Sequence, residues 1–144
     1  IYKLNMNKIL INALFGACSK NFQKPVRQTR RLASTYKVVQ IKEHGTPLEI
    51  VEKKQTKLKP SQVRVQVSYC SVNSVDCYKF KQGGGHFPFV PGYELSGEVM
   101  EVGNDIRGDQ ISVGEKVVGL SLENFGGLAQ ECVVSLSLIF QSLF

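Results

Sequence analysis

Two short stretches of the sequence carry side chains that could do chemistry. In "PFVPGYELSGEVMEVG", the pair Tyr93 and Glu94 directly follows a Pro-Gly turn. A carboxylate beside a rigid turn could hold a metal, whereas a neutral phenol is not among the usual zinc ligands. The first stretch could therefore be either a metal-binding site or a former metal site that has lost its ligands. The second stretch, "NSVDCYKF", presents an amide, a carboxylate and a phenol, namely Asn73, Asp76 and Tyr78.

The remaining metal-ligating and phosphate-binding residue types point to structural roles. His44 and His86 each lack a Cys, His or carboxylate at ligand spacing, so we expect two surface or loop histidines. The glycines at 83–85 follow a predicted helix instead of opening one, which indicates a flexible turn and not a phosphate-binding loop. Of the four cysteines, Cys18 lies in the N-terminal segment that we expect to be removed. The absence of CxxC spacing predicts buried or half-buried reduced thiols at the other three, Cys70, Cys77 and Cys132.

The elements that must position these residues are mostly strands. Period-two alternation and turn signals predict six short strands at 36–41, 48–53, 62–69, 94–103, 115–120 and 128–134. In the third strand, Val63, Val65 and Val67 face one way, and Arg64, Gln66 and Ser68 face the other. Gly97 predicts a kink or bulge in the fourth. Because no β-α-β alternation appears, the pattern predicts a mainly β, barrel-like domain without a parallel nucleotide-binding sheet.

One short helix is predicted between the third and fourth strands. Asn73 suits the N-cap position, and Asp76 stands three residues later, where its carboxylate can reach back to free backbone amides. Lys79 and Lys81 stand near the end of the helix, and Gly83 can close it in a left-handed conformation.

The net charge of +6 is concentrated at the N-terminus. Residues 1–32 hold seven bases and no acid, whereas the remainder has a net charge of −1, so we expect no nucleic-acid partner. An acid-free, Arg-containing start predicts a mitochondrial transit peptide over about 1–35, with cleavage before Ala33 and Met6 as a candidate initiator. A secretory signal around the apolar run 9–18 and a cytoplasmic location are the alternatives. That run is too short to span a bilayer.

Four motifs occur in a characteristic order: "CSVNSVDCYKFKQGG", "PFVPGYELSGEVMEVG", "VGEKVVGL" and "GGLAQECVV". Together they resemble the N-terminal, GroES-like catalytic domain of the medium-chain dehydrogenase/reductase superfamily, and within it the zinc-independent quinone oxidoreductase branch. The resemblance covers about 36–134. It implies a partly open β-barrel with one short inserted helix, preceded by the presequence and followed by an atypical apolar tail at 135–144.

The resemblance also bears on the metal question. Zinc-dependent members place a cysteine at the position of Asn73 and a Gly-His-Glu triplet at the positions of Gly92, Tyr93 and Glu94. A catalytic zinc needs three protein ligands, and neither an amide nor a phenol replaces a thiolate or an imidazole. The lobe that carries the four-cysteine structural zinc site is also missing. The resemblance therefore argues against either zinc.

What replaces the metal follows from the same resemblance. Members of this branch pass hydride from NADPH to a quinone or enone, and the developing oxyanion needs hydrogen-bond donors. Asn73 and Tyr78 match cleft residues, with Asp76 between them. Asn73 could donate to the substrate oxygen or contact the nicotinamide ribose, and the Tyr78 hydroxyl could donate a hydrogen bond. The alternatives are purely structural roles: Asn73 as the N-cap of the helix, Asp76 as its capping partner and Tyr78 as a core aromatic. Glu94 is expected to order the turn.

The C-terminal end of the sequence departs from the family. Members continue into a dinucleotide-binding domain, whereas residues 135–144 read "SLSLIFQSLF". We expect a truncated or incomplete oxidoreductase chain that does not transfer hydride alone. Its tail could be a read-through, an alternative terminus, an edge strand or an aggregation-prone segment. The alternative is a non-enzymatic GroES-like module that binds or dimerises, as a homodimer or with a full-length relative. No stable membrane span is expected.

Overall fold

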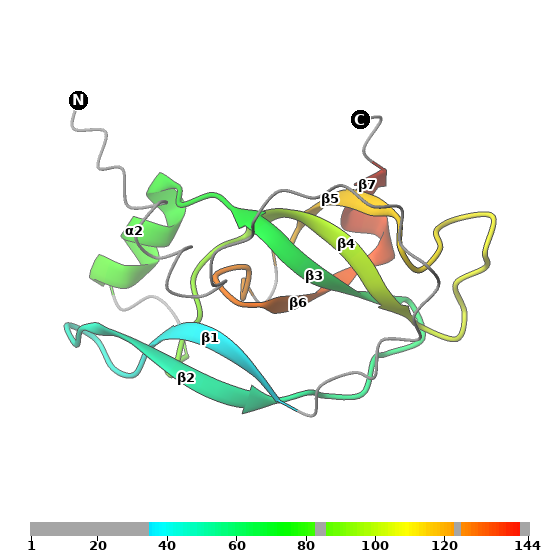
Figure 1. Ribbon diagram of the computed structural model, residues 1–144. Coiled ribbons are helices and arrows are strands. Elements are labelled where there is room, and N and C mark those ends of the chain that lie inside the picture. Colours follow the sequence, from blue (N-terminus) through cyan, green and yellow to red (C-terminus); the bar gives the residue numbers. More distant parts are fainter. Residues whose placement is uncertain (1–34, 83–85, 123–124, 142–144) are drawn as a thin grey trace, which may run out of the picture.

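The computed structural model describes residues 35–82, 86–122 and 125–141. These ranges hold one α-helix, α2 (Ser74–Gln82), one 3-10 helix, η1 (Leu136–Leu138), and seven strands (Figure 1). The strands are β1 (Thr35–Ile41), β2 (Leu48–Lys54), β3 (Gln62–Cys70), β4 (Glu94–Val102), β5 (Lys116–Leu120), β6 (Glu131–Ser135) and β7 (Ile139–Gln141). The proposed presequence, Cys18, the glycines at 83–85 and the expected helix stop at Gly83 lie outside the described residues.

Two sheets make up the fold. The larger is antiparallel, with strand order β6-β3-β4-β5-β7, and the smaller is the hairpin β1-β2. The hairpin lies below the larger sheet in the view of Figure 1, and isolated bridges join Val38 to Ala129 and Ile41 to Phe89. The domain is mainly β with one short helix and sheets that do not close, as the sequence and the family resemblance predicted.

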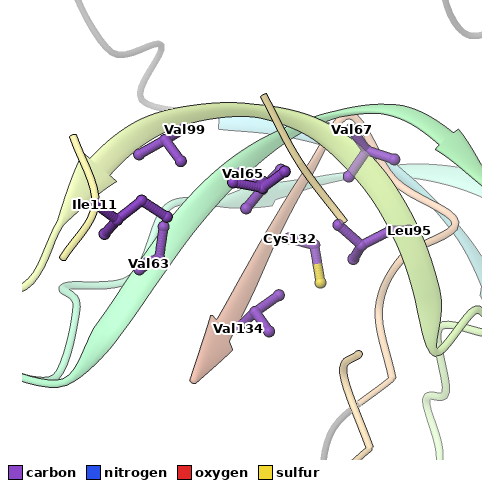
Figure 2. Close-up of a cluster of buried hydrophobic side chains, with 9 residues drawn as sticks. Val63, Val65, Val67, Leu95, Val99, Ile111, Cys132 and Val134 are labelled. Atoms are coloured by element: carbon purple, nitrogen blue, oxygen red, sulfur yellow. The ribbon is translucent and has the colours of Figure 1, made fainter. Parts of the chain in front are cut away.

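Valines of β3 form the centre of the core. Val63, Val65 and Val67 are each at most 2 % exposed, as their alternation predicted. Around them pack Leu95, Val99, Ile111, Val117, Cys132 and Val134 (Figure 2). Most of these residues are β-branched, and such side chains fit the pleated surface of a strand well. The core fixes the strand ends that carry the polar residues of interest.

Arg64 projects from the opposite face of β3, yet only 2 % of it is exposed. Its Nε donates to Glu101 Oε2 at 2.9 Å, and its Nη1 lies 3.8 Å from Glu131 Oε2. The guanidinium also donates to the Thr56 carbonyl in the segment after β2. A buried charge is costly unless it is paired and hydrogen-bonded, and these acceptors satisfy that requirement.

The irregularity expected at Gly97 lies on the facing strand. The β3–β4 register shifts between Val67 and Tyr69, which leaves Ser68 without a partner on β4. A Cβ added to Gly97 would stand 1.9 Å from the Gln66 carbonyl oxygen. Glycine is therefore required at position 97 because two backbones approach closely there.

The tail after β6 continues the sheet. Following η1, β7 pairs antiparallel with β5 and forms one edge of the larger sheet (Figure 1). Among the alternatives given for the tail, the edge strand describes residues 139–141. Within the part of the chain that the structure describes, no helix has the length and apolar character needed to cross a membrane.

Candidate functional site

The start of α2 is tied to the Pro-Gly turn by one carboxylate. Asp76 Oδ2 accepts the backbone N–H of Asn73 at 2.9 Å, and Asp76 Oδ1 accepts the backbone N–H of Gly92 at 2.7 Å. Asp76 is only 3 % exposed. The first bond is the reach back to the N-cap that the sequence predicted. The second was not foreseen, and it makes Asp76 a positioning residue that joins the helix to the turn.

The side chain of Asn73 is directed away from the helix. Its Nδ2 donates to Ser71 Oγ at 2.9 Å and to Glu94 Oε2 at 2.8 Å. The Ser71 hydroxyl donates to the same Glu94 oxygen at 2.7 Å. Asn73 caps α2 through its backbone carbonyl, which accepts the N–H groups of Asp76 and Cys77 at 3.1 and 3.2 Å.

The hydrogen bond to Glu94 also fixes which way the Asn73 amide points. An ionised carboxylate can only accept, so the Asn73 nitrogen must face Glu94 and Oδ1 must face away. None of the residues that the structure describes donates a hydrogen bond to Asn73 Oδ1. The amide oxygen of Asn73 is therefore the atom that remains for a ligand.

The turn that carries Tyr93 depends on a glycine. Gly92 has φ 91°, and a Cβ there would stand 2.4 Å from Cys70 Sγ and 2.8 Å from the Leu128 nitrogen. The neighbouring backbone is held by N–H donors at Gly126, Gly127 and Leu128, which bond to the carbonyls of Val90, Gly92 and Pro91 at 3.0, 2.7 and 2.9 Å. The turn is consequently a fixed platform for residues 93 and 94.

The electrostatics of the two platform residues differ. Hydrogen bonds from the Ser71 hydroxyl and the Asn73 amide lower the pKa of the Glu94 carboxyl, which keeps it ionised. Partial burial raises the pKa of Tyr93, and the adjacent Glu94 carboxylate raises it further. The Tyr93 ring makes an edge contact with Phe125, with ring centroids 5.8 Å apart. The platform thus pairs an anionic acceptor with a neutral phenol.

Tyr78 stands apart from the hydrogen-bonded group. It lies on α2 with 62 % exposure, which excludes a role as a core aromatic in this structure. The described residues make no hydrogen bond to its hydroxyl. The structure therefore brings Asn73 and Asp76 together around the turn and leaves Tyr78 open to a ligand.

A profile of one protein family matches residues 59–141, and its description is the alcohol dehydrogenase GroES-like domain. The chain belongs to this family. A quinone oxidoreductase-like protein 2 homolog of Nematostella vectensis is 41 % identical over 104 residues, covering 69 % of this chain. The quinone oxidoreductase of Coxiella burnetii has the same fold, with a TM-score of 0.67 and 28 % identity over 76 % of this chain and 37 % of its own. The structure of CAD from Helicobacter pylori complexed with NADP(H) shares the fold at 15 % identity. Its TM-score is 0.66, and the match covers 76 % of this chain and 42 % of that one.

This GroES-like chain spans 28 % of the length of the quinone oxidoreductase-like relatives from Nematostella vectensis and Bos taurus. The positions that the family resemblance assigns to zinc ligands are held by Asn73 and Tyr93. Among the described residues, no three His, Cys, Asp or Glu side chains gather in a group that could hold a metal ion. The chemistry of this donor set, an amide and a phenol, does not fit zinc.

The cysteines of the GroES-like domain are free thiols at positions 70, 77 and 132. Burial raises the pKa of Cys70 to about 12 and that of Cys132 to about 11, which makes both poor nucleophiles at neutral pH. Cys77 is exposed on α2, contrary to the expectation of a half-buried thiol.

Two residues of the site were not singled out from the sequence. Ser71 bonds to Glu94 because the pairing of β3 with β4 brings them together, and the backbone N–H of Ser71 donates to the Glu94 carbonyl at 3.1 Å. Phe125 reaches Tyr93 from a loop far along the chain. Ser71 lies inside the first family motif and Phe125 directly precedes the last one, but only the strand register and the loop path reveal their contacts.

Proposed function

We propose that this chain is the substrate-side domain of an NAD(P)H-dependent quinone or enone oxidoreductase that works without zinc. The observation that carries the proposal is the 2.8 Å hydrogen bond from the Asn73 amide to the Glu94 carboxylate. It occupies the place where zinc-dependent relatives hold metal ligands, and it orders a neutral amide there. The quinone oxidoreductase-like relatives support the same reaction class.

The residues present suit a nicotinamide cofactor and a carbonyl acceptor. When bound, NADPH supplies a hydride to the conjugated acceptor. The Asn73 Oδ1 atom is an acceptor that could hold a ribose hydroxyl or the carboxamide N–H of the cofactor. The exposed Tyr78 hydroxyl can donate to the oxygen of the acceptor, where negative charge develops. Asp76 and Glu94 hold these parts in place and do not take part in the chemistry.

Kinetics on the complete product of the gene test this assignment. Tyr78→Phe should lower kcat for quinone reduction by about tenfold or more, because a donor to the developing oxyanion is lost. Asn73→Ala should raise the KM for NADPH. Tyr69→Phe is the matched control, since Tyr69 is a similarly exposed tyrosine, 69 % against 62 % for Tyr78. Equal rates for Tyr78→Phe and Tyr69→Phe would remove Tyr78 from the proposal.

A second candidate function is a binding or dimerisation module. Tyr69, Val118 and Phe140 are 69 %, 46 % and 57 % exposed. Through Ser96 they form one row across four strands, since Tyr69 pairs with Ser96, Ser96 with Val118, and Val118 with Phe140. Cross-strand partners share a face of the sheet, so the three side chains present a mostly apolar strip, with Ser96 between Tyr69 and Val118, suited to a second copy of the chain.

Light scattering during gel filtration tests the second candidate. If the strip joins two copies, Val118→Ser should shift the chain toward the monomer. Val113→Ser should not, because Val113 is equally apolar and 62 % exposed but lies outside the strip. A monomer that both substitutions leave unchanged would dismiss the homodimer.

We also propose the mitochondrial matrix as the location, on the composition of residues 1–35 alone. A fluorescent protein fused behind these residues should enter mitochondria, and Arg30→Gln combined with Arg31→Gln should leave it in the cytoplasm. Secretion of the fusion would favour the signal-peptide alternative.

A further inference from the structure

A second concave region lies away from the Asn73 site. It is a pocket of about 990 Å³ lined by residues of β1, the segment after β2, the segment 86–90, β6 and, from α2, Lys79. Its volume falls at the upper end of the range of about 300–1,000 Å³ typical of small-molecule sites. The residues Asn73, Tyr78 and Glu94 are not among its walls.

Basic side chains supply much of the polar lining of this pocket: Lys53, Lys57, Lys59, Lys79 and His86. Among the described residues that line it, Glu131 is the one carboxylate. Glu131 Oε2 accepts Gln55 Nε2 at 2.6 Å and lies 3.8 Å from the Arg64 guanidinium, so its charge is already compensated. The lining consequently presents an excess of positive charge, which favours an anionic ligand.

Aromatic rings also line the pocket. Phe89 and Phe125 pack edge to face with centroids 5.3 Å apart, and Tyr36 adds a third ring. The Lys79 ammonium lies 4.1 Å from the Phe125 ring centroid. This contact places a positive charge directly beside the aromatic rings, so that a flat apolar group and an anion can be held next to each other in the pocket.

We propose that this pocket binds a small amphipathic anion, a carboxylate or phosphate carried on a flat apolar group. The aromatic rings take the flat group, and Lys53, Lys57 and Lys79 face the anion. Phe125 separates this pocket from the platform of the candidate site, since its ring also contacts Tyr93 at 5.8 Å. The inference does not rest on the proposed oxidoreductase activity, and its test uses neither NADPH nor a quinone.

Calorimetric titration of the 144-residue chain with 2-naphthoate tests the proposal. Neutral 2-naphthalenemethanol, which has the same rings and no charge, is the comparison ligand, and 2-naphthyl phosphate distinguishes the two anions. Naphthoate should bind at least about tenfold more tightly than the alcohol, and its affinity should fall as salt is raised. Lys53→Gln should weaken naphthoate binding about threefold, and the Lys57→Gln/Lys79→Gln pair about tenfold.

The neighbouring residue provides a matched control. Lys54 follows Lys53 on β2 but points to the other side of the hairpin and does not line the pocket. Lys54→Gln changes the net charge equally and should leave the affinity within about twofold of wild type. Circular dichroism melting verifies that each variant is folded. Equal binding of acid and alcohol, equal effects of Lys53→Gln and Lys54→Gln, or no binding at all would overturn the proposal.

Discussion

The side-chain amide of Asn73 donates a 2.8 Å hydrogen bond to the Glu94 carboxylate, which ties the start of α2 to the first residue of β4. The two residues are 21 positions apart in the sequence, so the bond closes a loop that includes the whole helix and the Pro-Gly turn. It sets the orientation of the amide and, with the Ser71 hydroxyl, keeps Glu94 ionised.

Replacing the Asn73 donor of this hydrogen bond with a carboxylate should destabilise the fold. In Asn73→Asp, a second carboxylate replaces the donor and faces Glu94, and like charges at contact repel. We expect a lower urea midpoint at neutral pH and a smaller loss at acidic pH. Asn104→Asp, at an exposed turn, makes the same chemical change and should behave like wild type. The same shift in both variants would contradict the described contact.

The acid dependence of stability should depend on Glu94. Its folded-state pKa lies below the ordinary value of 4.5, because Ser71 and Asn73 donate to the ionised form. A depressed carboxyl pKa contributes stability above the unfolded-state value, and this contribution disappears as the pH falls through the folded-state value. Urea melts between pH 7 and 3 should therefore show a shallower acid decline for Glu94→Gln than for wild type. The exposed β2 residue Glu52, changed to Gln, is the control, and an equal flattening there would refute the assignment.

The turn before Tyr93 should tolerate no side chain at position 92. Gly92 and Gly114 have nearly equal backbone angles, φ 91° and 92°, so alanine suffers the same left-handed strain of about 1–2 kcal/mol at both. A Cβ at Gly114 meets nothing within 4 Å, whereas one at Gly92 would stand 2.4 Å from Cys70 Sγ. Gly92→Ala should lower the free energy of unfolding by roughly 1–3 kcal/mol more than Gly114→Ala does. Chemical denaturation measures both, and equal losses would mean that the turn has room.

Loss of the buried guanidinium of Arg64 should lower the free energy of unfolding far more than loss of an exposed guanidinium. Arg64→Met leaves the nearly buried Glu131 without its cationic neighbour, and breaking a buried pair typically costs about 3–5 kcal/mol. Arg107→Met removes a pair whose side chains are 77 % and 69 % exposed, and it should cost less than about 1 kcal/mol. Thermal melting of the two variants should therefore separate clearly. A stable Arg64→Met protein would show that Gln55 alone satisfies Glu131.

Local pattern was sufficient to predict much of the fold. The alternation of β3 placed its valines in the core, and the spacing of Asn73 and Asp76 predicted the backbone cap, because both depend on neighbours in sequence. The burial of Arg64 could not be read from the same alternation, since its cover comes from the segment after β2 and from β6. Likewise, the destination of the Asn73 side chain depends on the pairing of β3 with β4. The burial of Arg64 and the hydrogen-bond partner of the Asn73 side chain therefore depend on residues distant in sequence, which a local pattern does not reveal.

Quinone reduction by the complete gene product tests whether the proposed site acts without a metal. The rate of NADPH oxidation with a quinone is measured before and after exhaustive dialysis against EDTA, and again after zinc is added back. We expect a rate that stays within about twofold throughout, because Asn73 and Tyr93 cannot serve as zinc ligands. A rate that is lost on dialysis and restored by zinc would contradict it.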